Sequence, residues 1–224
     1  TPANFILGFW KIDGQDVIVG GEDFTVKGGS PNAAGLRKSV YTEDLAVKHK
    51  FPLVRLHEGG GGSVAGPSKE KKGYGGDPVF ARSRFKSVAQ TLKEVPVVSA
   101  ALGPVAGLPA SRFVGSHFRI MVKDNAQILV AGPAVVSRAF GKDFTKEELG
   151  GSDVHKKNGV TDNIAESEED AFSQIKKFLS FFPANIYELP PKKDSKDSTN
   201  RSEKLLEEII PKDRKKTYEM REII

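Results

Sequence analysis

The stretch "PVVSAALGPVAGLPAS", residues 96–111, begins as an apolar run and ends in a turn rich in glycine and proline. An unbroken apolar run of strand length, here 96–103, is typical of a strand buried on both faces, as in a parallel sheet covered by helices. Pro109 suits the first position of a helix, where its missing N–H costs nothing. The stretch therefore predicts a buried strand, a glycine turn and a short helix beginning at Pro109, which is the pattern of an α/β domain.

Strands and helices are expected to alternate on both sides of this stretch. Asp13-Gly14 lies between two short apolar segments and predicts a β-hairpin within 9–26. The other expected elements are a helix in 28–50 that starts at Ser30-Pro31, a strand at 51–58, an amphipathic helix at 77–95, strands at 117–124 and 126–132, helices around 133–140 and 145–149, and an amphipathic helix at 167–182. This order predicts one α/β domain over 1–189. A polar, proline-led linker is expected at 190–203, followed by a helix and a further segment at 204–224.

The composition is that of a globular protein with a modest positive charge. Apolar residues make up 38% and charged residues 28%, the formal net charge is +5, and cysteine is absent. The lack of cysteine excludes a disulfide framework and fits a reducing compartment. The basic clusters at 68–76, 190–198 and 211–221 are mixed with acids and turn residues, which favours solvated loops. Since no run reaches the roughly 20 apolar residues of a membrane span, we expect neither a nucleic-acid nor a membrane partner. The charge balance suits a small molecule that carries phosphate.

Familiar patterns of catalytic side chains are missing from the sequence. The four histidines show no HExxH pattern and no i, i+4 pair, so no metal site is expected. They are His49, His57, His117 and His155. Ser63, Ser99 and Ser111 lack the G-x-S-x-G context of a nucleophile elbow. For each of these histidines we therefore prefer a structural or surface role, and a catalytic triad built on one of the serines is not expected.

Two glycine-rich segments, 59–62 and 103–107, each follow an apolar strand. Such a segment is either a flexible loop or a place where the backbone approaches a ligand closely, and the residues alone leave both interpretations open. Ligands of α/β sheets bind at the carboxyl ends of strands. If a helix begins at Pro109, we expect the N–H groups of Gly107 and Leu108 to point outward beside its start. Paired N–H groups can stabilise a developing oxyanion without any catalytic side chain.

Six segments, in order along nearly the whole chain, resemble the N-terminal half of the carboxyltransferase subunit of biotin-dependent acyl-CoA carboxylases, the group that acts on propionyl-CoA, methylcrotonyl-CoA and acetyl-CoA. They are "EDFTVKGGS" (22–30), "FPLVRLHEGGGGS" (51–63), "LGPVAG" (102–107), "ILVAGPAVV" (128–136), "EELGGSDVHKKNGVTD" (147–162) and "PKDRKKTYEMREII" (211–224). The resemblance implies a crotonase-like fold, a β-β-α superhelix. It also implies transfer of a carboxyl group from carboxybiotin to the α carbon, or the vinylogous γ carbon, of an acyl-CoA.

The resemblance assigns the site to backbone atoms. The family's GPxAGG glycine pair falls on Gly107 and Leu108, and its second glycine loop falls on 58–63. The backbone N–H groups that would hold the thioester enolate belong to Gly107, Leu108, Gly61 and Gly62. The implied substrate contacts are Gly60, Ala106, Pro109, Gly132 and Pro133. Three positions depart from the family pattern, since Leu108 replaces a glycine, Pro109 an alanine and Ser63 an arginine.

The resemblance also implies cofactors and partners. These are an acyl-CoA substrate, biotin carried as carboxybiotin on a carrier domain and bound mainly by an absent C-terminal half, a biotin carboxylase and the biotin carboxyl carrier subunit. We expect a homo-oligomer in the full-length form, an inactive fragment on its own, and no metal. The compartment would be the cytoplasm in a prokaryote and the mitochondrial matrix in a eukaryote.

Three other functions stay open. The chain could belong to an acyl-CoA decarboxylase, which runs the same chemistry in reverse. It could be a non-catalytic homologue that serves assembly or CoA binding, as the departures at Leu108, Pro109 and Ser63 suggest. It could also be a crotonase-type hydratase or hydrolase, which needs a positioned carboxylate. Glu58 is the candidate for that carboxylate.

Overall fold

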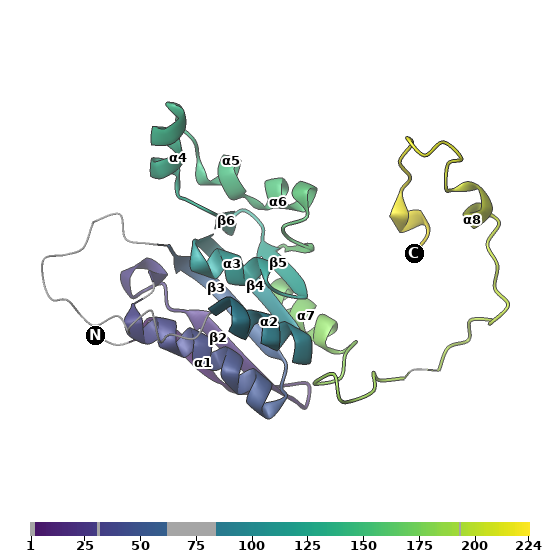
Figure 1. The fold of residues 1–224 in the computed structure, drawn as a ribbon, viewed down its shortest axis with the longest axis horizontal. Coiled ribbons are helices and arrows are strands. Elements are labelled where there is room, and N and C mark those ends of the chain that lie inside the picture. The colour runs from purple at the N-terminus through teal and green to yellow at the C-terminus, as the bar shows by residue number, and fades with distance from the viewer. Residues whose placement is uncertain (1–2, 31, 62–83, 193) are drawn as a thin grey trace, which may run out of the picture. The chain divides into compact units, whose positions relative to one another are not determined.

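A computed structural model describes residues 3–30, 32–61, 84–192 and 194–224. The described residues form a seven-stranded sheet in the order β1-β2-β3-β4-β5-β7, with β6 paired to β4 (Figure 1). The pair β1 and β2 is antiparallel, and the other pairs are parallel. The chain divides into two compact units, Thr1–Pro191 and Lys192–Ile224. The expected α/β architecture therefore lies in the first unit.

The N-terminal hairpin consists of β1 (Phe5–Ile12) and β2 (Gln15–Glu22). Asp13 and Gly14 both have positive φ, 48° and 87°, which a two-residue turn between twisted strands requires. The hairpin prediction is confirmed, although the first strand begins at Phe5 rather than after residue 9.

Helix α1 (Ala33–His49) joins β2 to β3 (Leu53–Gly60). The side chain of its N-cap residue, Asn32, accepts a hydrogen bond of 2.7 Å from the Gly35 N–H. The predicted helix start at Ser30 is therefore wrong, because the asparagine cap satisfies a free helical N–H further along the chain. Ser30 instead follows a short left-handed turn, Lys27–Gly29.

Helix α2 (Arg84–Glu94) leads into β4 (Val97–Ala106). Residues 97–101 are all buried, which confirms a strand covered on both faces. The strand continues beyond its predicted end because β6 (Gln127–Leu129) pairs with 104–106. Helix α3 (Leu108–Val114) follows after Gly107, so Pro109 takes the second helical position rather than the predicted first.

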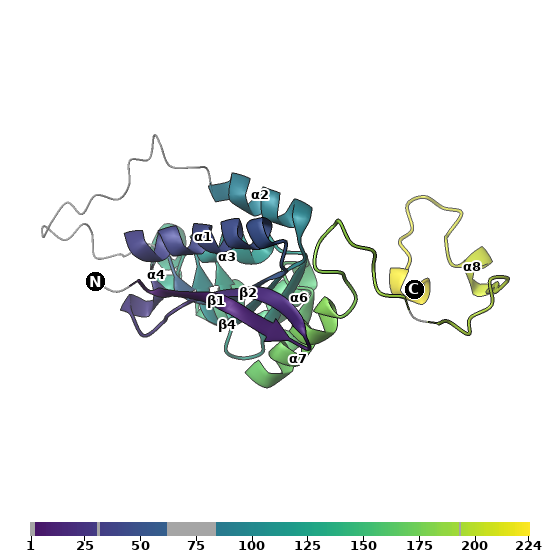
Figure 2. The ribbon, with the colours of Figure 1, turned by 90° about the horizontal axis from the view of Figure 1, so that it is seen from below.

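The rest of the first unit extends and covers the sheet. The elements are β5 (Phe118–Val122), α4 (Pro133–Phe140), α5 (Lys146–Gly150), α6 (Ser152–Asn158), β7 (Asn163–Ala165) and α7 (Glu168–Leu179). Figure 2 shows α1, α2 and α3 on one side of the sheet and α7 on the other. The short elements α6 and β7 were not predicted.

Apolar side chains between these layers form the core. One cluster joins the inner strands to Phe113 of α3 and to Ala171, Ile175 and Leu179 of α7. A second cluster packs Leu45 and Ala46 of α1 against the sheet. In the second unit the described elements are α8 (Leu205–Glu208) and a 3-10 turn, Met220–Glu222. Within the described parts of the chain, no helix has the length and apolar character needed to cross a membrane.

Candidate functional site

Three backbone segments meet at the carboxyl ends of β3 and β4. A Cβ placed on Gly29 would lie 2.6 Å from the carbonyl oxygen of Glu58 and 3.1 Å from the nitrogen of Gly60. A Cβ placed on Gly107 would lie 3.2 Å from the Cα of Gly61. Side chains do not fit at such distances, so the close approach requires glycine on both sides. We call this set the glycine junction: Gly28, Gly29, Gly59, Gly60, Gly61 and Gly107.

Backbone conformation also requires glycine in the junction. The φ angles of Gly59, Gly60 and Gly61 are 93°, 95° and 85°, and Gly107 has φ 68° with ψ −126°. L side chains rarely adopt this region. Leu108 is not among the residues with positive φ, because it occupies the first helical position. The departure from glycine at 108 therefore needs no strained backbone.

The N–H groups of Gly107 and Leu108 differ in their hydrogen bonding. The Gly107 N–H donates to the Leu129 carbonyl oxygen at 3.2 Å, next to the pairing of β4 with β6. The prediction that this N–H points outward is therefore wrong, because a short strand far along the chain takes it. The Leu108 N–H has no hydrogen-bond partner among the residues that the structure describes. Leu108 thus presents an unused donor beside the junction.

Ala106 and Pro109 form walls of the junction. A Cβ placed on Gly60 would lie 2.6 Å from Pro109 Cγ and 3.0 Å from the Ala106 carbonyl oxygen, and one placed on Gly61 would lie 3.4 Å from Ala106 Cβ. Pro109 is buried against this surface. The structure therefore brings together three predicted substrate contacts, Gly60, Ala106 and Pro109. It also shows that the proline at 109 fits because residue 60 has no side chain.

Leu108 lies at a small cavity on the α1 side of the junction. This cavity, of about 10 Å³, is also lined by Asn4, Leu36 and Arg112. That volume is close to the space one water occupies. Leu108 therefore borders the interior between α3 and α1.

The other predicted site residues lie elsewhere. Gly132 is the N-cap of α4 and Pro133 its first residue. A Cβ placed on Gly132 would meet no heavy atom within 4 Å, so Gly132 faces open space. Gly62 and Ser63 lie outside the described residues, and their assigned roles stay predictions.

Glu58 lies over β4. A Cβ placed on Gly103 would lie 2.7 Å from a carboxylate oxygen of Glu58. The carboxylate therefore lies beside Gly103, which precedes Gly107 by four residues in β4 and the turn after it. Glu58 also lines an open cavity of about 490 Å³, mostly apolar, with Trp10, Leu56 and Leu102. The carboxylate therefore lies over β4 and beside an apolar sheet face.

A cluster of charges lies buried between α1, β3 and α3. Glu43 Oε1 accepts from Arg55 Nη2 at 2.9 Å and from Arg112 Nε at 3.0 Å. Arg55 Nη1 donates to the carbonyl oxygens of Arg112 and Gly115 at the end of α3, at 3.1 and 2.9 Å. Arg112 Nη1 donates to Ser39 Oγ at 2.6 Å. The cluster ties α3 to both α1 and β3.

Burial dominates the electrostatics of this cluster. It raises the pKa of the Glu43 carboxyl, and the charges of Arg55 and Arg112 oppose that rise. It lowers the pKa of Arg55 to about 10, against the attraction of Glu43. No sequence motif predicted a role for these residues. The available signal was a charged side chain within an apolar segment, such as Arg55 in "FPLVRLHE".

The histidines do not join the glycine junction through side-chain hydrogen bonds to it. His57 Nδ1 lies 3.0 Å from Glu22 Oε2 in a buried pair, and His155 Nε2 lies 2.8 Å from the Ile128 carbonyl oxygen. Within the described residues, no three His, Asp or Glu side chains are grouped as a metal site would need. These histidines make structural contacts.

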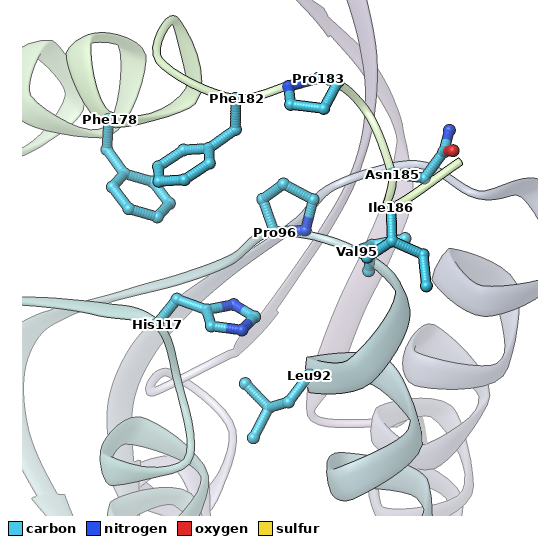
Figure 3. Close-up of a pocket in the computed structure, with 9 residues that line it drawn as sticks. All are labelled: Leu92, Val95, Pro96, His117, Phe178, Phe182, Pro183, Asn185 and Ile186. Carbon is cyan, nitrogen blue, oxygen red and sulfur yellow. The ribbon is translucent and has the colours of Figure 1, made fainter. Parts of the chain in front are cut away.

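His117 faces an apolar pocket at the amino ends of the strands (Figure 3). The pocket measures about 390 Å³, and Figure 3 shows Phe178, Phe182 and Pro96 around the imidazole. His117 Nδ1 accepts the Val97 N–H at 3.0 Å, and burial lowers the pKa of the ring. Both effects favour the neutral imidazole. The other lining residues that Figure 3 labels are uncharged, so the pocket offers shape and apolar surface.

Known proteins match the chain along its length. The sequence profile described as "Carboxyl transferase domain" matches residues 5–224. Methylmalonyl-CoA decarboxylase subunit alpha of Veillonella parvula is 32% identical over 220 residues, which are 98% of this chain and 42% of that protein. The propionyl-CoA carboxylase beta chain of Roseobacter denitrificans is 31% identical over 220 residues, with 98% and 42% covered. The chain therefore spans less than half the length of these relatives.

A solved structure with the same arrangement is that of transcarboxylase 12S, described as having methylmalonyl-coenzyme A and methylmalonic acid bound. It superposes with a TM-score of 0.74 and 27% identity, over 99% of this chain and 42% of that one. Its carboxyltransferase domain has the crotonase-like fold, so the predicted fold is confirmed.

Proposed function

Because this chain belongs to the carboxyl transferase domain family, we propose that it is the acyl-CoA-binding half of a biotin-dependent carboxyltransferase. The reaction would move a carboxyl group between carboxybiotin and the α carbon, or the vinylogous γ carbon, of an acyl-CoA. The observation that carries this proposal is the glycine junction, where Leu108 presents an N–H with no partner among the described residues.

The junction fits the charge that such a reaction creates. Loss of the α-proton moves negative charge onto the thioester oxygen, and fixed N–H donors stabilise that charge because they need no reorganisation. Leu108 would supply one donor, and the loop that begins at Gly61 would supply the second. Each donor of this kind contributes about 10²–10³-fold in rate. Carboxybiotin, when bound, would supply the carboxyl group and the base.

The remaining predicted contacts have distinct roles in the proposal. Gly60, Ala106 and Pro109 would shape the wall beside the thioester, and Gly107 would set the turn that aims the Leu108 N–H. Gly62 would donate a second N–H to the enolate oxygen. Gly132 and Pro133 would contact the CoA moiety.

The domain division is also proposed. Residues 1–189 would form the acyl-CoA domain, 190–203 a linker, and 204–224 the approach to a second carboxyltransferase domain. We propose biotin carboxylase and a biotin carboxyl carrier subunit as partners, and a homo-oligomer as the working form. Cytoplasm or mitochondrial matrix stays the expected compartment.

Calorimetric titration of this chain with a series of short acyl-CoA thioesters tests the binding role. We expect binding of at least one acyl-CoA, and loss of that binding in Gly107→Val, since a side chain would meet Gly61 and could not adopt φ 68° cheaply. Gly159→Val is the matched control, because Gly159 has φ 76° and open space around its Cβ position. No binding of any acyl-CoA or of CoA would contradict the proposal.

The direction of the reaction is a second question, raised by the similarity to a decarboxylase subunit. The full-length protein should be assayed both for carboxylation of acyl-CoA with carboxybiotin and for decarboxylation of the carboxylated product. Turnover in either direction supports a catalytic role. Its absence in both, with acyl-CoA binding intact, favours a scaffold.

A further inference from the structure

Ser30 links the glycine junction to the N-terminal part of the domain through side-chain hydrogen bonds. Its hydroxyl donates to the carbonyl oxygen of Gly61 at 3.0 Å. We propose that Ser30 is a positioning residue, which holds the Gly61 carbonyl oxygen in the orientation that the reaction needs. This inference rests on the proposed function, and it adds a side chain to a site otherwise made of backbone.

The turn before Ser30 is held against the end of β3. Lys27, Gly28 and Gly29 all have positive φ, which folds the chain tightly over Gly59 and Gly60. A Cβ placed on Gly29 would lie 3.0 Å from Gly59 Cα. The Ser30 N–H donates back to the Lys27 carbonyl oxygen at 3.2 Å. The backbone that carries the Ser30 hydroxyl is therefore held in place by this turn.

Asn4 fixes Ser30 from the other side. Its side-chain amide donates to the Ser30 carbonyl oxygen, and its Oδ1 accepts the Asn32 N–H at 3.4 Å. Asn4 is only 2% exposed, and its own carbonyl oxygen accepts the Asp23 N–H at 3.0 Å. The hydrogen bonds thus run from the N-cap of α1, through Asn4 and Ser30, to Gly61.

Gly61 is where orientation matters most. It has φ 85° and is the first residue after β3. A Cβ placed on Gly61 would lie 3.4 Å from Ala106 Cβ, and one placed on Gly107 would lie 3.2 Å from Gly61 Cα. The bond from the Ser30 hydroxyl fixes the direction in which the Gly61 carbonyl oxygen points.

Without the hydroxyl, the Gly61 carbonyl would lose the side-chain hydrogen bond that fixes its direction. A carbonyl oxygen turned toward the thioester would repel the developing oxyanion, whereas binding of the neutral ground state would change little. The effect should therefore fall on kcat rather than on KM, because only the transition state carries the charge. Small misplacements of this kind cost up to about 10²-fold in rate.

Kinetics of the full-length protein with its acyl-CoA substrate test the inference. For Ser30→Ala we expect kcat to fall about 10- to 100-fold with little change in KM. Ser30→Thr keeps the hydroxyl and should restore most of kcat. Ser173→Ala is the matched control, since it removes an exposed hydroxyl that donates to a helical carbonyl at 2.9 Å. Turnover by Ser30→Ala equal to wild type, or a Ser30→Thr variant as slow as Ser30→Ala, would overturn the inference.

Hydrogen–deuterium exchange gives a second readout that does not need activity. Amides in the peptide that covers Gly59–Gly61 should exchange faster in Ser30→Ala than in wild type or Ser173→Ala. Unchanged exchange in this peptide would contradict a positioning role of Ser30, even if the wild type proves inactive. An inactive wild type whose exchange does respond to Ser30→Ala would count against the proposed function alone.

Discussion

The two ends of α3 have opposite chemistry. At its start, Leu108 follows the glycine junction, and the walls are glycine, alanine and proline. One turn further along, Arg112 belongs to a buried cluster with Glu43 and Arg55. The ionisable groups are therefore inside, where they attach α3 to α1 and β3, and the surface proposed to react is backbone.

This contrast explains why side-chain motifs were uninformative about function. The buried charges of Glu43, Arg55 and Arg112 hold α3 against α1 and β3. The glycines of the junction let three backbone segments approach one another closely. Changes in the cluster should therefore act on stability, and changes in the junction should act on turnover.

The largest effect on stability is expected for Glu43→Leu. It removes the carboxylate oxygen that accepts from both Arg55 Nη2 and Arg112 Nε, and leaves two buried guanidinium groups without that acceptor. Removing one partner of a buried ion pair costs about 3–5 kcal/mol. Urea denaturation of this chain measures the loss.

Glu43→Gln sharpens this prediction, because the amide oxygen still accepts both hydrogen bonds. It should cost clearly less than Glu43→Leu. Glu166→Gln, in an exposed pair with Lys123, is the control and should leave the midpoint unchanged. Equal losses of stability in Glu43→Leu and Glu43→Gln would show that the hydrogen-bond acceptor at position 43 does not stabilise the cluster.

Among the side-chain substitutions, Gly60→Val should have the largest effect on turnover. Its Cβ would lie 2.6 Å from Pro109 Cγ, and valine cannot adopt φ 95° without strain. Displacement of the junction should lower kcat/KM of the full-length protein by about 10²-fold or more. A Gly60→Val variant with wild-type kcat/KM would show that the glycine junction is not part of the active site.

The pH dependence of stability tests the charge of Glu43. Its pKa is raised by burial, so the folded protein binds this proton more tightly than the unfolded chain. The Glu43 contribution is therefore fully present below the ordinary pKa and is lost as pH rises through the raised folded value. The stability of wild type minus that of Glu43→Gln should decrease as pH rises above 4.5, the ordinary value for this carboxyl, in denaturation experiments. An increase over this range would reverse the assignment.

Leu108→Gly should have the smallest effect. Leu108 has an ordinary helical backbone and borders the interior beside α1, so the leucine is not expected to narrow the acyl site. We expect an unchanged acyl-CoA profile and a modest loss of stability, since glycine costs about 1 kcal/mol in a helix interior and Leu108 stands at the first helical position. A broadened substrate range in a panel of acyl-CoA assays would show that Leu108 does contact the acyl group.

Local signals predicted much of the fold. The unbroken apolar run at 96–103 gave the buried strand, and Asp13-Gly14 gave the hairpin turn, because burial on two faces and positive φ each restrict the residue types allowed. The start of α1 was misplaced because Ser30-Pro31 and Asn32 are both plausible starts, and only the bond from Gly35 distinguishes them.

Non-local contacts explain what the sequence could not predict about the site. The Gly107 N–H donates to the carbonyl oxygen of Leu129, and the Gly61 carbonyl oxygen accepts from the hydroxyl of Ser30. The charged cluster joins Glu43 to Arg112, 69 positions away. No periodicity links such residues, because their proximity follows from the way the strands pair and the helices pack.

The central claim is that the backbone N–H of Leu108 stabilises the substrate oxyanion. Replacing the amide at 108 by an ester, with the leucine side chain kept, removes this donor and weakens the Gly107 carbonyl, which accepts the Ser111 N–H at 3.1 Å. Because the Leu108 N–H itself has no partner among the described residues, we predict a kcat about 10²–10³-fold lower with only a small fall in melting temperature. The same replacement at Gly107 also removes the bond to Leu129 and should lower the melting temperature more. Full turnover by the Leu108 ester would contradict the claim.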